Sequence, residues 1–302
     1  MLEDADGIIG FHSIKAPEYG LLPLFLSGRQ CASRVTRVQH PMDLVKSNAQ
    51  KIISDFELLG GNGMALADNS LNRVYGPNPV IMAEGAKARG CIFNTEEGPV
   101  WIGKNALVME GSIIRGPVAI GEGAVIKMGA QIYGGTTLGK KSTAGGEIKN
   151  SILGDFSNKA HHGYLGDSII GEWCNLGAGT SNSNVKNNAG TIEMHSGLPG
   201  PRVKIGQKAG MVMGDFCKTA INSSVNSGTT IGVGCSIHHT GLTNKFIPSF
   251  TWGLNERYEF NKLLRDIENW AIFKQEKLAP EMVGILNQLY AIVPGAHDEN
   301  HG

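Results

Sequence analysis

A repeat of six residues constrains the fold of this 302-residue chain more than any other feature of its sequence. A branched aliphatic residue returns at every sixth position, and a small residue follows it four positions later. The aliphatic series is Ile102, Val108, Ile114, Ile120, Ile126, Ile132 and Leu138, and the small series is Ala106, Ser112, Val118, Ala124, Ala130, Thr136 and Ser142. One inward side chain in every six residues predicts one short strand and one corner per unit, so that three units complete a triangular coil of about 18 residues. Successive coils would pair at the parallel-sheet spacing of about 4.8 Å.

Glycine is concentrated in the same region, where 30 of the 42 glycines lie between residues 80 and 250. It often follows the aliphatic residue directly, as in Ile102-Gly103 and Ile120-Gly121. Glycine at these places indicates that the backbone bends or that a neighbouring strand approaches closely. So many glycines and β-branched residues exclude a helix in this region.

The register of the repeat is not uniform along the chain. It shifts after Asn150, shifts again at Ile170 and resumes at Met213. Residues 182–202, which are rich in asparagine and glycine, interrupt the coil. Because long interruptions of a regular scaffold are usually functional loops, we expect this segment to lie near a site.

The limits of the repeat divide the chain into three segments. They are a small α/β segment at 1–79, a β-helix at 80–250, and helices with a tail at 251–302. Helical spacing of apolar residues predicts a helix between Pro41 and Leu59, and two amphipathic helices near the C-terminus, the second with Pro280 in its first turn. The predicted apolar faces of these two are Leu263, Ile267, Trp270 and Ala271, and then Met282, Ile285, Leu286 and Leu289. We expect both helices to pack on the end or side of the β-helix.

Charge and cysteine content exclude several classes of protein. Basic and acidic residues both number 27, so the electrostatic footprint of a general nucleic-acid binder is absent. No apolar run is long enough to span a membrane, and Glu3, Asp4 and Asp6 stand where a signal peptide would carry basic residues. The five cysteines form no CxxC pair, which indicates free thiols in a reducing cytoplasm.

Two apparent motifs carry little chemistry. Gly134-x4-Gly139-Lys140-Lys141 nearly spells a phosphate-binding loop, but it ends in lysine and lies inside the six-residue register. The pairs His161-His162 and His238-His239 lack a partner at metal-ligand spacing, and adjacent side chains on a strand point in opposite directions. We therefore expect no metal.

Polar and cationic residues cluster between Glu147 and Lys186, where the repeat falters. Such residues would suit acyl transfer to an amine: His161 as the base that removes the amine proton, with lysines to hold phosphate and amide or phenol groups to hold sugar hydroxyls. The candidates for phosphate are Lys127 and Lys149, and those for hydroxyls are Tyr164, Asn175 and Asn184. The alternative is that these side chains are ordinary polar positions of a solenoid.

The repeat resembles that of the hexapeptide-repeat transferases, whose fold is a left-handed parallel β-helix. Within it, the stretch from Glu147-x-Lys149 through Lys-Ala-His161, Tyr164-Leu-Gly-Asp167 and Asn175-Leu-Gly-Ala-Gly-Thr180 to Asn184 resembles one family closely. That family is the acetyltransferase half of the bifunctional N-acetylglucosamine-1-phosphate uridyltransferase/glucosamine-1-phosphate acetyltransferases.

This resemblance implies roles for particular residues. It implies a catalytic base at His161 and sugar-phosphate contacts at Lys149, Tyr164, Asn175 and Asn184. It also implies acetyl-CoA or another acyl-CoA in a groove between subunits of a homotrimer. Lys127 stands where the family has an arginine, Val185 where it has a tyrosine, and Asp215 where it has a serine near the thioester.

The whole chain is still more similar to a sugar nucleotidyltransferase-like branch, through Gly171-Glu-Trp-Cys-Asn-Leu-Gly177 and Phe246-Ile-Pro-Ser-Phe-Thr-Trp-Gly253. Proteins of this branch carry a nucleotidyltransferase domain before the β-helix. The chain shows no G-x-G-T-R signature near its start, so residues 1–79 are interpreted as a remnant of that domain, or the chain as a fragment.

Three functional hypotheses remain open. The first is a cytoplasmic acyl-CoA-dependent transferase acting on a sugar phosphate or nucleotide sugar that carries an amine, with no nucleic-acid or membrane partner. The second is a trimerising, regulatory part of a sugar-1-phosphate nucleotidyltransferase with no chemistry of its own. The third is a purely structural solenoid.

Overall fold

The computed structural model describes residues 2–4, 7–10, 29–30, 38–59, 63–66, 71–196, 200–238 and 241–293. Contacts within the chain divide it into two units, residues 1–39 and 40–302. In the first unit, β1 (Leu2–Asp4) pairs antiparallel with β2 (Gly7–Gly10) and parallel with β3 (Arg29–Gln30). The remaining elements belong to the second unit.

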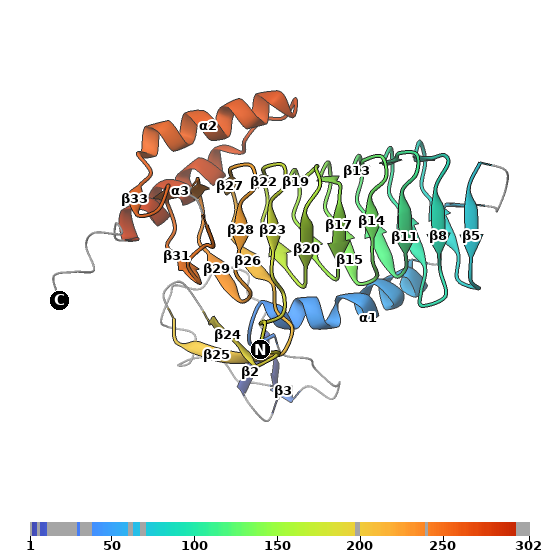
Figure 1. The fold of residues 1–302 in the computed structure, drawn as a ribbon, viewed down its shortest axis with the longest axis horizontal. Coiled ribbons are helices and arrows are strands. Elements are labelled where there is room, and N and C mark those ends of the chain that lie inside the picture. The colour runs from blue at the N-terminus through green and yellow to red at the C-terminus, as the bar shows by residue number, and fades with distance from the viewer. Residues whose placement is uncertain are drawn as a thin grey trace. The chain divides into compact units, whose positions relative to one another are not determined.

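The second unit is a parallel β-helix, consistent with the left-handed form that the resemblance implies (Figure 1). Each coil runs through three sheets in turn, here called sheets I, II and III. Sheet I contains β4 (Met64–Ala65), β6 (Val80–Met82), β9 (Val100–Ile102), β12 (Val118–Ile120), β15 (Thr136–Leu138), β18 (Ile152–Leu153), β21 (Ile169–Ile170), β26 (Met211–Met213), β29 (Thr229–Ile231) and β31 (Phe246–Ile247). Sheet II contains β7 (Lys87–Ala88), β10 (Leu107–Val108), β13 (Val125–Ile126), β16 (Thr143–Ala144), β19 (Asn158–Lys159), β22 (Asn175–Leu176), β27 (Lys218–Thr219), β30 (Ser236–Ile237), β32 (Thr251–Trp252) and β33 (Glu256–Arg257).

Sheet III is shorter than the other two. It contains β5 (Arg73–Tyr75), β8 (Ile92–Asn94), β11 (Ile113–Arg115), β14 (Gln131–Ile132), β17 (Glu147–Lys149) and β20 (Tyr164–Gly166). After β20 the same side of the coil continues as a separate pair, β23 (Ser181–Asn182) and β28 (Ser224–Val225). The break in sheet III therefore falls in the polar stretch that the sequence analysis singled out.

Strand pairing explains both the repeat and its irregularities. Val118 pairs with Val100 and with Thr136, eighteen residues away on either side, which confirms a coil of three six-residue units. Thr137 then pairs with Ile152, only fifteen residues on, because the corners after β16 and β17 are both shorter. This short coil is the register shift seen after Asn150.

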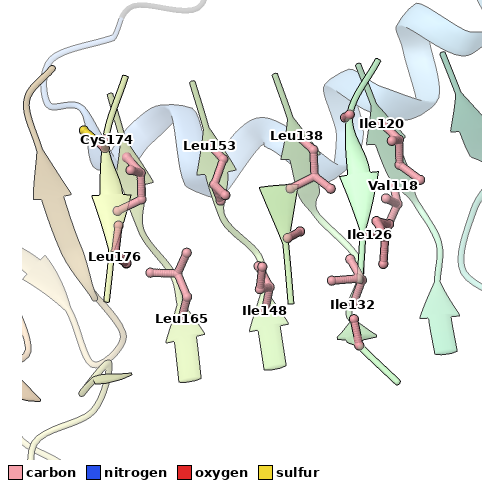
Figure 2. Packing of buried hydrophobic residues seen from close by; sticks show 14 of the residues in the cluster. Val118, Ile120, Ile126, Ile132, Leu138, Ile148, Leu153, Leu165, Cys174 and Leu176 are labelled. Carbon is pink, nitrogen blue, oxygen red and sulfur yellow. The ribbon is translucent and has the colours of Figure 1, made fainter. Parts of the chain in front are cut away.

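The predicted aliphatic series forms the core of the β-helix. All seven side chains of the series are at most 2% exposed, and Figure 2 shows Ile120, Ile126, Ile132 and Leu138 pointing into the interior. One inward position of the register is a lysine, Lys159, which is 1% exposed.

Two kinds of glycine close the corners. A Cβ atom added to Gly121 would lie 2.7 Å from the carbonyl oxygen of Leu138, so the next coil leaves no room for a side chain there. Gly123 has a φ of +64°, in the left-handed region that glycine enters without strain. Close approach and corner geometry thus account for the excess of glycine.

Helix α1 (Met42–Leu58), predicted between Pro41 and Leu59, lies along sheet I against β12 and β15 (Figure 1). The Nδ2 atom of Asn48 donates to the carbonyl oxygen of Gly135 at 2.7 Å, and its Oδ1 accepts from the Thr137 hydroxyl at 3.1 Å. The amide side chain thereby ties α1 to the edge of a coil.

The predicted interruption at 182–202 is longer in the structure: it begins after β23 (Ser181–Asn182), ends before β26 and contains a β-hairpin of β24 (Ile192–His195) and β25 (Arg202–Gly206). Ile192 and Met194 of β24 pack against Met42 and Val45 at the start of α1. The insertion therefore has a small apolar core of its own, shared with the helix.

The two predicted C-terminal helices are α2 (Phe260–Phe273) and α3 (Pro280–Ile292), with Pro280 in the first turn of α3. They pack on a row of aromatic corner residues between sheets I and II, all with positive φ. The row consists of Phe156, Trp173, Phe216 and Phe250, and the rings of Phe156 and Trp173 stack at 4.2 Å. None of the helices in the described ranges is long and apolar enough to span a membrane.

Candidate functional site

A group of polar side chains gathers at the corner between sheets III and I, just after β20. Asn184 donates from Nδ2 to the Tyr164 hydroxyl at 3.0 Å and to Oδ2 of Asp167 at 2.5 Å. Asn150 donates to the other carboxylate oxygen, Oδ1 of Asp167, at 2.7 Å. We call these four residues the Tyr164 cluster. The structure thus brings together Tyr164 and Asn184, two of the predicted site residues.

Asp167 organises the Tyr164 cluster from the centre. Its side chain is 6% exposed overall, and its backbone has a φ of +47°, which directs the carboxylate toward both asparagines. The sequence analysis named Asp167 only as part of a motif and assigned it no role. Its place at a corner, where Asp and Asn tolerate the left-handed conformation, was the available indication.

The Tyr164 phenol stays protonated throughout the physiological range. Burial, followed by the negative charges of Asp167 and Glu147, raises the pKa of Tyr164 to about 12. Asn184 donates to the Tyr164 hydroxyl, so the hydroxyl proton itself can be donated to a ligand. The ring covers Gly166, where an added Cβ would overlap the phenol, so a side chain at this position would displace the ring.

Lys149 stands beside the Tyr164 cluster on the outer face of sheet III. It pairs with Gly166 in the strand ladder, and its Nζ lies 5.8 Å from the centre of the Tyr133 ring. No described carboxylate forms an ion pair with this ammonium group. The Lys149 ammonium is therefore carried by the strand next to the one that bears Tyr164.

The sheet III ladder ends here because a side chain replaces the backbone. The amide of Asn182 accepts from the Gly166 nitrogen at 2.9 Å and donates to the Gly166 oxygen at 3.0 Å. Asn182 is 4% exposed, so its side-chain amide is buried between β20 and the next coil. This amide separates the two coils beside Tyr164.

His161 lies exposed in the corner between β19 and β20, at the start of the strand that carries Tyr164. Beneath it, the buried Lys159 donates from Nζ to the carbonyl oxygens of Gly145, at 3.1 Å, and of His161, at 2.5 Å. Burial lowers the pKa of Lys159 from 10.5 to about 8. The lysine therefore clamps the corner that presents the imidazole.

Lys127 occupies the same corner two coils earlier. Its backbone nitrogen donates to Ala144, and Gly145 in turn donates to Lys159. The coil between Lys127 and His161 thus turns through Gly145 and Gly146, which carry no side chain. Lys127 and His161 therefore lie on either side of the backbone of Gly145 and Gly146.

The two remaining predicted residues lie elsewhere in the chain. Asn175 is on sheet II, where its Oδ1 accepts from Asn158 at 3.3 Å. Asp215 is at the corner between sheets I and II, and its Oδ1 accepts from the Glu172 nitrogen at 2.8 Å, as Asp155 accepts from Lys140 two coils earlier. A single chain therefore does not gather all seven predicted residues into one cavity, and the roles of Asn175 and Asp215 stay predictions.

Metal ligation has no support within the described ranges. No group of three or more His, Cys, Asp or Glu side chains there is placed to hold a metal ion. Four cysteines are buried free thiols, and burial raises the pKa of Cys174 and Cys217 well above the usual value.

Comparison with known proteins agrees with the repeat. A family model described as bacterial transferase hexapeptide (six repeats) matches residues 99–134. These residues are thus similar to the hexapeptide repeats of bacterial transferases. The chain is 35% identical over 106 residues to the bifunctional protein GlmU of Methanocaldococcus jannaschii. The aligned residues make up 35% of this chain and 26% of that protein.

A second relative has a more explicit name. The bifunctional sugar-1-phosphate nucleotidylyltransferase/acetyltransferase of Sulfurisphaera tokodaii is 32% identical over 100 residues, 33% of this chain and 24% of that protein. The chain thus spans about a quarter of the length of these relatives. Among solved structures, the UDP-N-acetylglucosamine acyltransferase of Arabidopsis matches with a TM-score of 0.36 and 16% identity, covering 66% of this chain and 77% of that one. A TM-score this low carries no argument.

Proposed function

We propose that the protein is an acyl-CoA-dependent transferase acting on a phosphorylated or nucleotide-linked amino sugar. The observation that carries the proposal is the Tyr164 cluster, with the Lys149 ammonium and the exposed His161 on either side of it. A relative named as an acetyltransferase supports the reaction class.

The proposed reaction transfers an acyl group to the amine of the sugar. The imidazole of His161 removes a proton as the nitrogen attacks the thioester carbonyl. The C–N bond forms, the C–S bond breaks, and the proton passes to the leaving CoA thiolate. His161 is suited to this role because its ring is exposed while Lys159 fixes its backbone.

The acceptor would be held by the groups around His161. The Tyr164 phenol and the Asn184 amide would contact sugar hydroxyls, and Lys149 and Lys127 would hold the phosphate. The neutral phenol suits a hydroxyl because it can donate without bringing a negative charge near the phosphate.

The donor site is proposed to need a second copy of the chain. Asn175 and Asp215 lie on sheet II and at its corner with sheet I, whereas Tyr164 and Lys149 lie on sheet III. A homotrimer would bring sheet III of one copy to another copy and form the groove for acyl-CoA. We propose the cytoplasm as the location, because that compartment keeps thiols reduced and holds nucleotide sugars.

Release of free CoA thiol tests the proposal directly. The chain is incubated with acetyl-CoA and a panel of amino-sugar phosphates and nucleotide-linked amino sugars. We expect release with at least one acceptor, and a loss of at least 100-fold in kcat for His161→Ala. His162→Ala is the matched control, an adjacent exposed histidine that should retain activity. Equal activity in His161→Ala, or no release with any acceptor, would refute the proposal.

A second candidate function rests on one of the relatives. This candidate is the trimerising and regulatory part of a sugar-1-phosphate nucleotidyltransferase, and it is favoured by the name of the Sulfurisphaera tokodaii relative. Sedimentation equilibrium separates the two: a trimer with no thiol release favours this candidate, and a monomer excludes the shared acyl-CoA groove.

A further inference from the structure

Three cations that are distant in the sequence meet beside the inserted hairpin. Lys186 follows the asparagine-rich run, Arg202 begins β25, and Lys245 directly precedes β31. None of the three was assigned a role above. We call them the cationic triad.

One side of the triad is joined through the hairpin. His195 pairs with Arg202 across the β24–β25 ladder. The His195 ring lies 4.7 Å from the ring of Phe246, the residue that follows Lys245. These two contacts bring the strand of Arg202 next to the last coil at Lys245.

The other side is joined through backbone carbonyls. Lys245 donates from Nζ to the oxygen of Ser227 at 2.8 Å, and Lys186 donates from Nζ to the oxygen of Thr191. Gly228 follows Ser227 in the sequence, and Ile192 follows Thr191. Gly228 and Ile192 are in contact, since a Cβ added to Gly228 would lie 2.4 Å from Cγ2 of Ile192. Both ammonium groups are therefore anchored on neighbouring backbone.

The triad brings three positive charges together. None of its members forms an ion pair with a carboxylate of the described residues. Burial, followed by the charges of Lys186 and Arg202, lowers the pKa of Lys245. Anchored like charges with free donor capacity are favourable for a multiply charged anion.

The triad and the Tyr164 cluster lie along one edge of the β-helix. Gly210 donates to the oxygen of Asp167, and Gly228 donates to the oxygen of Gly210 at 2.7 Å. Ser227, which holds Lys245, is thus about two coil spacings, or roughly 10 Å, from Asp167. Asn184 of the cluster is also only two residues before Lys186. One ligand can therefore reach both groups.

We propose that Lys186, Arg202 and Lys245 form a binding site for a diphosphate group, carried by a ligand whose other end reaches the Tyr164 cluster. Both a nucleoside diphosphate sugar and CoA carry such a group. The inference deepens the proposed function by naming the phosphate site, while binding of diphosphate itself does not depend on acyl transfer.

Isothermal titration with inorganic diphosphate tests the site. We expect saturable binding to the wild-type chain, and a dissociation constant about tenfold weaker for Arg202→Ala, Lys186→Met or Lys245→Met. Lys208→Ala, which removes an exposed lysine just after the hairpin, is the matched control and should bind like the wild type. Thermal melting checks that each variant is folded. Absence of binding to the wild type, or equal binding by the triad variants, would overturn the proposal.

Two further titrations distinguish the sources of the diphosphate. If Arg202→Ala weakens CoA but not a uridine diphosphate sugar, the triad holds the donor; the reverse result assigns it to the acceptor. If neither ligand is weakened, the proposal is wrong. Diphosphate binding that persists without any thiol release would refute the acyl transfer while leaving the triad in place.

Discussion

The buried Lys159 makes the stability of the protein depend on pH in a defined direction. Its pKa is lowered to about 8 in the folded chain, against 10.5 when it is exposed on unfolding. Between these two values the unfolded chain binds more protons than the folded one, so stability rises with pH. Below pH 8 the folded lysine is charged, and its burial opposes folding in full.

The size of this effect follows from the two pKa values. Raising the pH from 7 to 10 removes most of this penalty. The free energy of unfolding rises by about 2.5 kcal/mol over that range. Lys159→Met keeps a straight side chain of similar length in the core but has nothing to titrate. At pH 7 the variant escapes the charge penalty but leaves the oxygens of Gly145 and His161 without their donor, so its net stability change is small.

Urea unfolding at pH 7 and pH 10 measures this difference for the wild type and for Lys159→Met. Shifts from the other titrating groups, Lys274 and Tyr164 among them, occur in both proteins and cancel. We expect the wild type to gain about 2.5 kcal/mol more than the variant between the two pH values. An equal gain would show that Lys159 is not buried as a titrating group, and the reasoning would fail.

Other predictions concern the helices, the corners and the acceptor site. Trp173→Ala should cost about 3 kcal/mol in urea unfolding and expose α2 and α3 to proteolysis, because the ring is 7% exposed beneath them; unchanged cleavage would contradict this. Gly121→Ala should destabilise by about 1 to 3 kcal/mol through its clash with the next coil, while Gly284→Ala, with nothing within 4 Å, should stabilise α3 by about 0.5 to 1 kcal/mol. Tyr164→Phe should raise the acceptor KM about tenfold with a smaller change in kcat, and an unchanged KM would remove the phenol from the site.

The six-residue repeat predicted the coils because each unit is local: an inward aliphatic, a small residue and a corner. The repeat gave no indication that Lys159, which the structure places at an inward position, would donate from Nζ to two corner carbonyls. Those carbonyls belong to different coils, Gly145 following β16 and His161 following β19, so a local pattern cannot bring them together.

Long-range contacts limit what could be predicted at the site. The pattern placed Tyr164 and Asn184 in one polar stretch, and they do meet. The sequence pattern did not predict the β24–β25 hairpin, because β24 is stabilised by Met42 and Val45, about 150 residues earlier in the chain. Nor could spacing along one chain show that Asn175 and Asp215 lie on other faces of the coil than Tyr164, which requires a second copy for a shared site.

Transfer of a labelled acetyl group tests the central proposal most directly. The chain, confirmed to be folded, is incubated with carbon-13-labelled acetyl-CoA and each amino-sugar acceptor, and the products are read by NMR. We expect an amide signal from labelled acetyl on the sugar nitrogen with wild type and with His162→Ala, and none above background with His161→Ala. A label that stays on CoA with every acceptor, or that reaches the sugar equally well without His161, would contradict it.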